Sequence, residues 1–316
     1  MITDCFVNKI FIEPYHEGCD ELCILAGYAS SNMASLMMTD IDKESLHHIN
    51  VHLVIGMTTF SGMTLVNHEG FKVIHDKPFR SVIDSFTCGY ISDGKPAHEN
   101  LYIWLKDDVP VKSFMGSAPL IQSAFLGNRS ELMAECDAET AYIIYREAES
   151  RSMYCNHAEI EDNVIITPEN YLSENTDQPS IIEGLGVEKV TLSLLTSRGD
   201  VGHGSGINWG QREGRNPNEA YIPAPAPVIG SKFFPTDRHF TAITDDRHIL
   251  ILRTEQAGDK AITTPASNAQ LGEYLRNRLS LPNGAFITKD KLIEYGRTDV
   301  DFCKIDDEHY YMDFSV

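Results

Sequence analysis

The chain has 316 residues, of which 42% are hydrophobic and 23% charged, and it carries a net charge of −20. A chain of this length exceeds one ordinary hydrophobic core, so we expect two domains. No stretch approaches the ~18 consecutive apolar residues of a membrane span, and an acidic residue, Asp4, precedes the first apolar run, unlike a secretory signal. These features indicate a globular cytoplasmic protein with no membrane partner.

The negative charge is unevenly distributed along the chain. Residues 1–200 carry 30 acidic and 13 basic side chains, a net charge of −17, whereas residues 201–297 carry 10 acidic and 12 basic side chains, a net charge of +2. Binding to nucleic acid depends on neutralising phosphates with Lys and Arg. The second half is therefore the part whose charge is compatible with nucleic acid.

In the first half, short apolar runs alternate with helix-like segments. In chain order these are residues 20–30, 31–41, 51–57, 71–77, 99–105 and 130–149, with strands expected at 51–57 and 99–105 and a helix at 130–149. Strands interleaved with helices predict an α/β layer structure. The pattern ends in the polar, acidic stretch 156–180, so we predict a first domain over 1–165 and a linker over 166–185.

The rest of the chain, 186–316, reads as short strands separated by turns. The strand and turn signals cover 187–199, 220–230, 239–254, 260–265, 284–296 and 309–316, and one helix is expected over 269–279. Short strands at close intervals with one embedded helix predict a β-rich, barrel-like domain.

The seven cysteines are odd in number and scattered, which indicates reduced thiols rather than a disulfide framework. His16, Cys19 and Cys23 lie close enough to suggest a metal site. The other nearby pair of suitable types, Cys155 and His157, does not complete a zinc spacing. We therefore expect buried thiols and no metal or cofactor.

Two blocks of the first half carry candidate catalytic residues. One is PAHENLYIWLK at 96–106, with His98, Asn100 and Tyr102; the other is FMGSAPLIQSAFLGNRSELMAE at 114–135, with Ser117 and Glu131. Together they resemble the phospholipase D superfamily, and more narrowly the NgoFVII and BfiI restriction endonucleases, closely over residues 50–140. The resemblance implies a phospholipase D-like α/β nuclease domain.

The family chemistry explains the residue types. An imidazole attacks a phosphodiester, a Lys and a polar side chain stabilise the charge of the pentacoordinate state, and a carboxylate fixes the ring tautomer, without metal. A second imidazole acts as general acid. Since this chain has one such motif, the resemblance implies a homodimer in which two copies of His98 share one site.

The chain departs from the family pattern at two positions. Asn100 stands where the family has Lys, and Pro119 where it has Asn. Losing one donor of this kind costs roughly 10²–10³ in rate. Lys106 lies about 26 Å away along the same strand, at roughly 3.3 Å per residue, so it cannot replace the missing charge, whereas Lys72 or Lys95 could. Taken alone, His98 would be an ordinary hydrogen-bonded histidine and Glu131 a first-turn helix residue.

In the second half, residues 202–227 concentrate polar side chains around glycines, as a donor-presenting arm would. Arg recognises guanine, and Asn or Gln recognises adenine, through two parallel hydrogen bonds in the major groove. The phrases INWGQR, NEAYIP, LGEYLRNRL and EYGR resemble the C-terminal part of NgoFVII-type endonucleases over 187–316, which implies a B3-like pseudobarrel that grips double-stranded DNA with two arms. The expected DNA-contacting residues are Asn208, Trp209, Gln211, Arg212, Arg215, Asn216 and Asn218 in the first arm, and Lys260, Ser267, Asn268, Gln270 and an outward-facing Arg276 in the second.

The favoured interpretation is a type II restriction endonuclease subunit, with an ATP-dependent helicase-like subunit as a further partner in some relatives. A different class of function is a catalytically impaired DNA-binding dimer that keeps the nuclease fold as a scaffold. A lipid-acting phospholipase D is a weaker alternative, because the second half does not resemble a lipid-binding module. The alternative for the two arms is a purely structural one, in which they are turns and a solvated helix face without DNA contacts.

Overall fold

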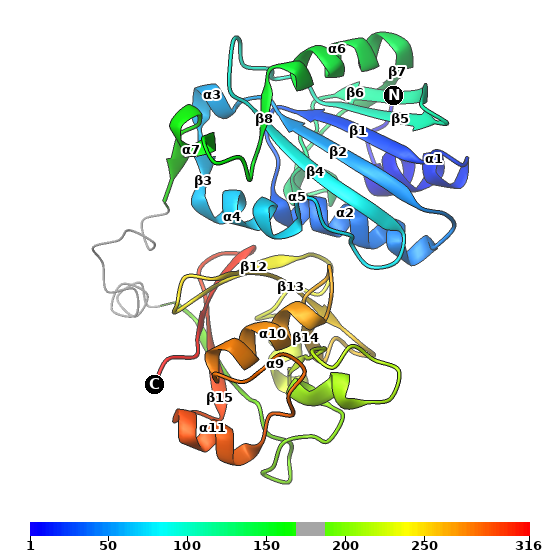
Figure 1. The fold of residues 1–316 in the computed structure, drawn as a ribbon. Helices are drawn as coiled ribbons and strands as arrows, with labels where there is room; N and C mark the ends of the chain where they lie inside the picture. The colour runs from blue at the N-terminus through cyan, green and yellow to red at the C-terminus, as the bar shows by residue number, and fades with distance from the viewer. Residues whose placement is uncertain (169–186) are drawn as a thin grey trace. The chain divides into compact units, whose positions relative to one another are not determined.

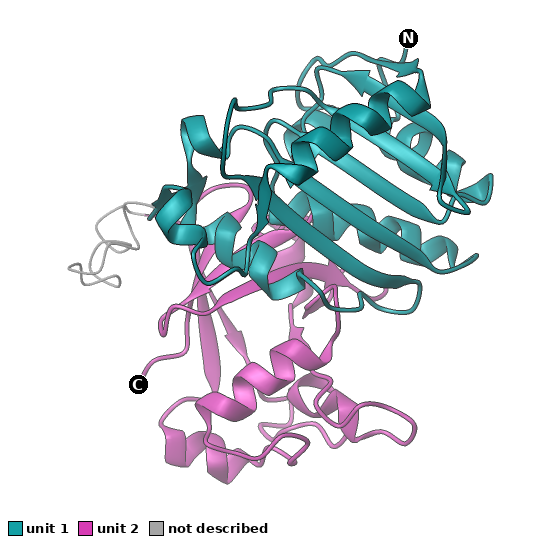
Figure 2. Ribbon diagram, turned by 45° about the horizontal axis from the view of Figure 1, so that its top comes forward, with its two compact units in different colours: residues 1–169 teal, residues 170–316 magenta. Residues whose placement is uncertain are grey.

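The computed structural model describes residues 1–168 and 187–316, and it divides the chain into two compact units, Met1–Glu169 and Asn170–Val316 (Figure 2). Most of the predicted linker, 166–185, lies outside the described residues. None of the helices in the described ranges is both long enough and apolar enough to span a bilayer.

In residues 1–168, seven strands form one sheet in the order β7-β6-β5-β1-β2-β4-β8. Strands β1, β2 and β4 are parallel, whereas β5 runs antiparallel to β1, β6 to β5, and β7 to β6. The elements of this unit are η1 Val7–Ile12, α1 Glu13–His16, β1 Glu21–Ala26, α2 Ser31–Glu44, β2 Ile49–Ile55, α3 Thr58–Ser61, β3 Met63–Thr64, α4 Leu65–Ile74, β4 Ile83–Ile91, β5 Leu101–Lys106, β6 Val109–Gly116, α5 Gln122–Phe125, β7 Met133–Cys136, α6 Ala138–Ser150, β8 Ser152–Tyr154, α7 Ile160–Asn163 and β9 Ile166–Thr167.

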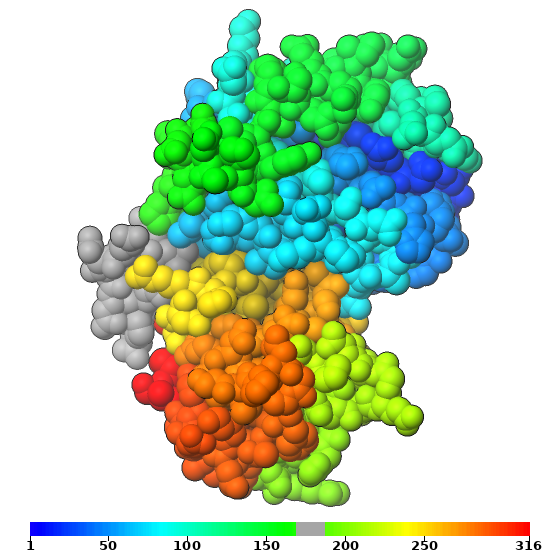
Figure 3. Space-filling model, viewed as in Figure 1, coloured from blue at the N-terminus to red at the C-terminus, as the bar shows by residue number. Residues whose placement is uncertain are grey.

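Helices cover both faces of this sheet (Figure 1). Helix α6 packs on β1, β5 and β6, with Tyr145 buried between helix and sheet, and its side chains cover the strands beneath it in the space-filling view (Figure 3). Helices α2 and α4 lie on the other face. Covered on both sides, the centre of β5 is a continuous buried run, Leu101–Leu105.

The predicted helix over 130–149 is wrong in its first part. Residues Met133–Cys136 form β7, which pairs with β6, and α6 begins only at Ala138. The break is made by Asp137, whose side chain accepts a 2.9 Å hydrogen bond from the N–H of Thr140 as the helix N-cap. Glu131 therefore precedes a strand, and its alternative interpretation as a first-turn helix residue is excluded.

In residues 187–316, seven further strands follow the order β10-β15-β16-β12-β13-β14-β11. The edge strands β10 and β11 also contact each other, so this sheet nearly closes into a barrel around one apolar core. Its elements are β10 Lys189–Ser193, η3 Gly206–Gln211, β11 Ile222–Pro223, α9 Ala226–Gly230, β12 Phe240–Thr244, β13 Ile249–Glu255, β14 Ala261–Thr263, α10 Ala269–Arg278, α11 Lys289–Tyr295, β15 Asp299–Lys304 and β16 His309–Asp313.

The expected helix over 269–279 is confirmed as α10, but the expectation of a single helix in this domain is wrong. The stretch 284–296 contains α11, which begins after Thr288, whose hydroxyl accepts from the N–H of Lys291, and ends at Gly296 with a φ of +107°. An N-capping Thr and a left-handed Gly are ordinary helix boundaries. The short apolar runs of 284–296 were therefore misread as strand.

Candidate functional site

The ends of three strands meet at one edge of the N-terminal sheet. Because β5 is antiparallel to β1, the residues before β5 lie beside the loops that follow β1 and β2. Two glycines permit this approach: a Cβ on Gly27 would lie 3.2 Å from the Cα of His98, and one on Gly56 would lie 2.0 Å from the carbonyl oxygen of Ala97. The backbone of the His98 segment is thus packed directly against these two loops.

The His98 side chain is exposed at this edge. Its ring lies edge-on to the ring of Tyr28, with the centroids 5.8 Å apart. Within residues 1–168 the imidazole forms no hydrogen bond, so both ring nitrogens are available to a substrate. Tyr28 was not identified from the sequence, although its place directly after the apolar strand β1 could have indicated it.

Asn100 is buried, with 5% of its surface exposed. Its side-chain amide donates to the carbonyl oxygens of Gly116 (3.2 Å) and Ser117 (3.3 Å) and accepts from the N–H of Gly27 (3.2 Å). An amide has two hydrogens to donate, and both are used here. Asn100 therefore ties the loop after β1 to the end of β6.

Ser117 and Glu131 are brought together by the pairing of β6 with β7. The hydroxyl of Ser117 donates to a carboxylate oxygen of Glu131 at 2.5 Å and accepts from the N–H of Leu132 at 3.0 Å. Arg129 places its Nε 3.8 Å from the other carboxylate oxygen. Glu131 is thus held by a hydroxyl and a guanidinium, and its predicted role of fixing the His98 ring stays a prediction.

The turn after β6 closes this edge from the other side. Leu120 pairs with the segment that follows β1: it donates to the carbonyl of Tyr28 and accepts from the N–H of Ser30. The hydroxyl of Tyr102 donates to the carbonyl of Ala118 at 2.9 Å, and burial, with the nearby charge of Glu131, raises the pKa of Tyr102. Pro119 lies in this turn between Ala118 and Leu120, the two residues that make these hydrogen bonds.

The basic side chains considered as substitutes for the missing Lys differ in position. Lys106 lies at the far end of β5, where it donates to the carbonyl of Glu17, and Lys72 pairs with Glu69 on α4. Lys95 is exposed three residues before His98. Arg129, which sequence reasoning missed, is more than half exposed and adjoins Glu131.

In the C-terminal domain, three of the predicted DNA-contacting residues are buried. Asn208 exchanges two hydrogen bonds with the backbone of Ile287, at 2.8 and 2.9 Å. Asn218 donates to Glu273 and accepts from the N–H of Gly284. These two amides join the loop that contains η3 to the loop before α11, and in this conformation they face the protein rather than solvent.

The expectation that Arg276 points outward is wrong. Its guanidinium is fully buried and donates to the carbonyls of Ala285 (2.7 Å), Gly272 (3.1 Å), Pro217 (3.1 Å) and Asn218 (3.3 Å). Burial lowers the pKa of Arg276, against the charge of Glu273. A helical wheel could not show this, because three of the four partners lie outside the helix: Pro217 and Asn218 in a loop distant in sequence, and Ala285 in the segment that follows α10.

The remaining predicted DNA contacts lie at the surface. Arg215 lies over the ring of the half-buried Trp209 at 4.0 Å and pairs with Glu219, while Arg212 donates to the carbonyl of Gly204. Exposed residues from both arms are Arg212, Arg215, Asn216, Lys260 and Ser267, and partly exposed ones are Trp209, Gln211, Asn268 and Gln270.

The seven cysteines are free thiols. His16 pairs with Glu44 at 2.8 Å, and Cys19 and Cys23 are buried. Across residues 1–168 and 187–316, no three His, Cys, Asp or Glu side chains are grouped so that they could hold a metal ion.

Two protein-family models match the chain, one in each of its two compact units. The model of the NgoFVII restriction endonuclease N-terminal PLD domain matches residues 5–162, and that of the NgoFVII C-terminal B3-like DNA-binding domain matches residues 183–306. The chain belongs to the NgoFVII restriction endonuclease family. The predicted fold, a phospholipase D-like α/β domain followed by a β-rich B3-like pseudobarrel, is confirmed.

No curated protein matches this NgoFVII-family protein. Among solved structures, a polyphosphate kinase from Porphyromonas gingivalis is similar with a TM-score of 0.30 and 11% identity, over 57% of this chain and 26% of the kinase chain. The chain thus spans about a quarter of that kinase.

Proposed function

We propose that this chain is the subunit of a homodimeric type II restriction endonuclease that cuts double-stranded DNA through His98 without a metal ion. The observation that carries the proposal is the free, exposed imidazole of His98 at the same sheet edge as the Ser117–Glu131 pair. Imidazole is a competent nucleophile toward phosphorus, and this arrangement leaves it open to a substrate.

In the proposed reaction, a ring nitrogen of His98 attacks the phosphorus and the bond to one ester oxygen breaks. The leaving oxygen takes a proton from His98 of the second subunit. That second imidazole then removes a proton from water, which attacks phosphorus and breaks the phosphorus–nitrogen bond, restoring both rings.

Exposed apolar side chains support a dimer through this edge. Tyr28, Phe60, Met115 and Leu132 are 41–75% exposed. Tyr28, Met115 and Leu132 lie at strand ends or in loops at the His98 edge of the sheet, and Phe60 lies in the short helix α3 that follows β2. Apolar side chains gathered at one surface are typical of a protein interface. A two-fold axis through such an interface would bring the two His98 side chains together.

Arg129 is proposed to supply the positive charge that the family takes from Lys. Its guanidinium lies 3.8 Å from Glu131 and is more than half exposed, so it can turn toward a bound phosphate. A guanidinium binds phosphate oxygens with two parallel hydrogen bonds. Arg129 would then compensate for Asn100, whose amide hydrogens are already used within the domain.

In the B3-like domain, the exposed side chains are proposed to contact DNA. Arg212, Arg215 and Asn216 lie on one loop, and Lys260 and Ser267 flank β14. The buried Asn208, Asn218 and Arg276 are proposed to fix the loops that present them. Substituting Arg212 should therefore change DNA binding without unfolding the domain.

A second candidate function is a DNA-binding dimer that keeps the nuclease fold as a scaffold. The structural use of Asn100 favours it, since neither Asn100 nor Pro119 offers a free side-chain donor to a phosphate. The two candidates differ in one property, the ability to break a phosphodiester bond.

The test incubates the purified chain with long unmodified DNA of mixed sequence in EDTA. Discrete fragments are expected from the parent protein and from His157→Ala, a control at another exposed histidine of the same domain, but none from His98→Ala, which should still bind DNA. Retained binding without cutting by the parent would favour the scaffold. Cutting by His98→Ala would exclude His98 as the nucleophile.

Arg129→Ala should lower the cutting rate at least tenfold, with partial recovery in Arg129→Lys, because Lys restores the charge but not the forked geometry. Sedimentation of the parent protein should show a dimer at micromolar concentration. A protein that remains monomeric and still cuts DNA would overturn the proposal that two subunits share one His98 site.

A further inference from the structure

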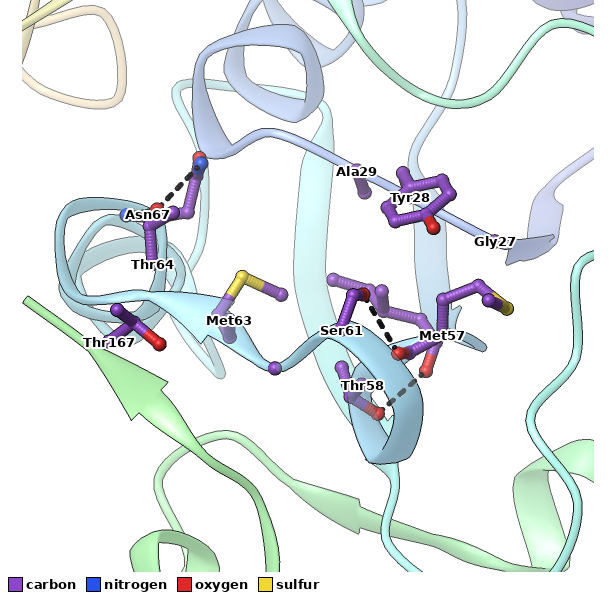
Figure 4. A pocket seen from close by; sticks show the side chains of 12 residues that line it. Gly27, Tyr28, Ala29, Met57, Thr58, Ser61, Met63, Thr64, Asn67 and Thr167 are labelled. Atoms are coloured by element: carbon purple, nitrogen blue, oxygen red, sulfur yellow. Dashed lines mark hydrogen bonds between the residues drawn. The ribbon is translucent and has the colours of Figure 1, made fainter. Parts of the chain in front are cut away.

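A cavity of about 360 Å³ opens beside His98 within the N-terminal domain (Figure 4). This volume lies within the range of small-molecule binding sites. It is formed by the loop after β1, by the segment from the end of β2 to the start of α4, and by β9. The residues that line it are Gly27, Tyr28, Ala29, Ile55, Met57, Thr58, Ser61, Gly62, Met63, Thr64, Asn67 and Thr167.

The cavity and the His98 edge share a wall. Tyr28 lines the cavity and also places its ring against the ring of His98, and Gly27 lines the cavity while its Cα packs on the backbone of His98. A phosphodiester that reaches His98 therefore carries one of its two flanking nucleosides close to Tyr28. The occupant is then a part of the same strand, adjacent to the reacting phosphate.

The lining is uncharged. None of the twelve residues is Asp, Glu, Lys, Arg or His, so the cavity offers no cation to a phosphate. It offers instead the aromatic ring of Tyr28 and the thioethers of Met57 and Met63, which suit the faces of a flat, neutral ring. A nucleobase matches this chemistry, whereas the phosphate and the ionised groups of a protein partner do not.

Polar atoms at the rim can meet the edge of such a ring. The hydroxyl of Thr64 accepts from the N–H and the side-chain amide of Asn67, so its own hydrogen remains to be donated. The Ser61 hydroxyl donates to the carbonyl of Met57 and can still accept. Figure 4 shows Ser61 and Met63 on one side of the space and Tyr28 on the other.

We propose that this cavity is a subsite for one nucleobase of the cut strand, taken out of the base stack beside the phosphodiester that His98 meets. The inference rests on the proposed nuclease function for the identity of the strand, but the cavity itself is independent of catalysis. Removing a base from the stack is unfavourable, and contacts with the pocket offset this cost.

The first test titrates the four free deoxynucleosides separately into the full chain and follows binding by saturation-transfer NMR. At least one should bind the parent, and Ser61→Phe, which fills the cavity from α3, should weaken that binding at least tenfold. Thr167→Phe, which fills the cavity from β9, should weaken binding to the same extent. It takes the place of Ser61→Phe if that variant is poorly folded. The control is Ser150→Phe, an exposed serine at the end of α6 whose hydroxyl also donates to a carbonyl of its own helix, that of Glu147, and it should bind like the parent.

The second test places 2-aminopurine at successive positions of a cut duplex and adds His98→Ala protein. Fluorescence should rise several-fold at one position next to the cut, and not with His98→Ala/Ser61→Phe. Nucleoside binding that is lost on filling the cavity supports the subsite even if the parent cuts no DNA. If the parent cuts DNA, binds no nucleoside and shows no fluorescence rise, the subsite is overturned and the nuclease remains.

Discussion

Replacing Asn100 by Ala tests whether this position serves the fold or the substrate. The substitution removes three hydrogen bonds and leaves the N–H of Gly27 and the carbonyls of Gly116 and Ser117 without this partner. A buried hydrogen bond contributes on the order of 1 kcal/mol. We therefore expect the N-terminal domain to lose roughly 3 kcal/mol of its free energy of unfolding.

Urea denaturation followed by tryptophan fluorescence measures this loss. The chain has two tryptophans, one in each domain. Trp104 is fully buried and its indole N–H donates to the carbonyl of Ile10 at 2.7 Å, so in a Trp209→Phe background the emission reports the N-terminal domain alone. Glu99→Ala, at the exposed neighbouring position, is the control and should change the free energy by less than about 0.5 kcal/mol.

The result that would refute this reasoning is an Asn100→Ala protein as stable as the parent but unable to cut DNA. Such a protein would mean that the amide turns away from its backbone partners and contacts the phosphate. If stability falls as expected, Asn100 acts by positioning the loop after β1, and the activity of the remaining folded protein reports on the other groups.

Three further predictions follow from the packing of both domains. Gly56→Ala should lower the melting temperature measured by calorimetry by several degrees and slow DNA cutting, because the new Cβ would meet the carbonyl oxygen of Ala97 at 2.0 Å. The control Gly230→Ala, with open space around its Cα, should have the melting temperature of the parent. Arg276→Met should destabilise the C-terminal domain by at least about 3 kcal/mol, because four carbonyls lose their donor. Arg212→Ala should keep the melting temperature of the parent and weaken DNA binding by about 1–3 kcal/mol in a fluorescence titration. Unchanged stability of Arg276→Met would argue against the buried role of Arg276. Burial would raise the pKa of Asp301, but Thr191, Lys189 and Arg297 outweigh burial and lower the pKa. The ionised carboxylate therefore stabilises the C-terminal domain above the usual pKa of about 3.8, and this stability is lost as pH falls through the lower pKa of the folded protein. Thermal unfolding of Asp301→Asn between pH 6 and 2 should show a smaller dependence on pH than the parent, and a slope equal to that of the parent would contradict this role of Asp301.

Much of the architecture was accessible from the sequence because it depends on local pattern. The apolar run of β5 and the periodicity of α10 were read correctly, since each is long and uninterrupted. The strand β7 was misread because its four residues, Met133–Cys136, continue without a break into the helical pattern of α6. The boundary depends on one cap, Asp137, and on pairing with a strand distant in sequence.

The candidate site divides in the same way. The resemblance to a known family singled out His98, Ser117 and Glu131, and the structure joins the last two by a hydrogen bond. The sequence could not show that Asn100 and Arg276 are buried, because their partners are backbone atoms of loops that meet only in the folded domain. Polar side chains near glycines look alike whether they face DNA or a neighbouring loop.

The four hydrogen bonds of Arg276 limit how the proposed DNA preference of this protein could change. They connect the loop around Pro217 to α10 and to the segment at Ala285, so a new course of either loop would leave these carbonyls without their guanidinium donor. New specificity would then have to arise from side-chain replacement at the few outward positions, such as 212 and 216, on an unchanged backbone. Selection experiments that randomise those positions alone should yield folded proteins far more often than libraries that include 276.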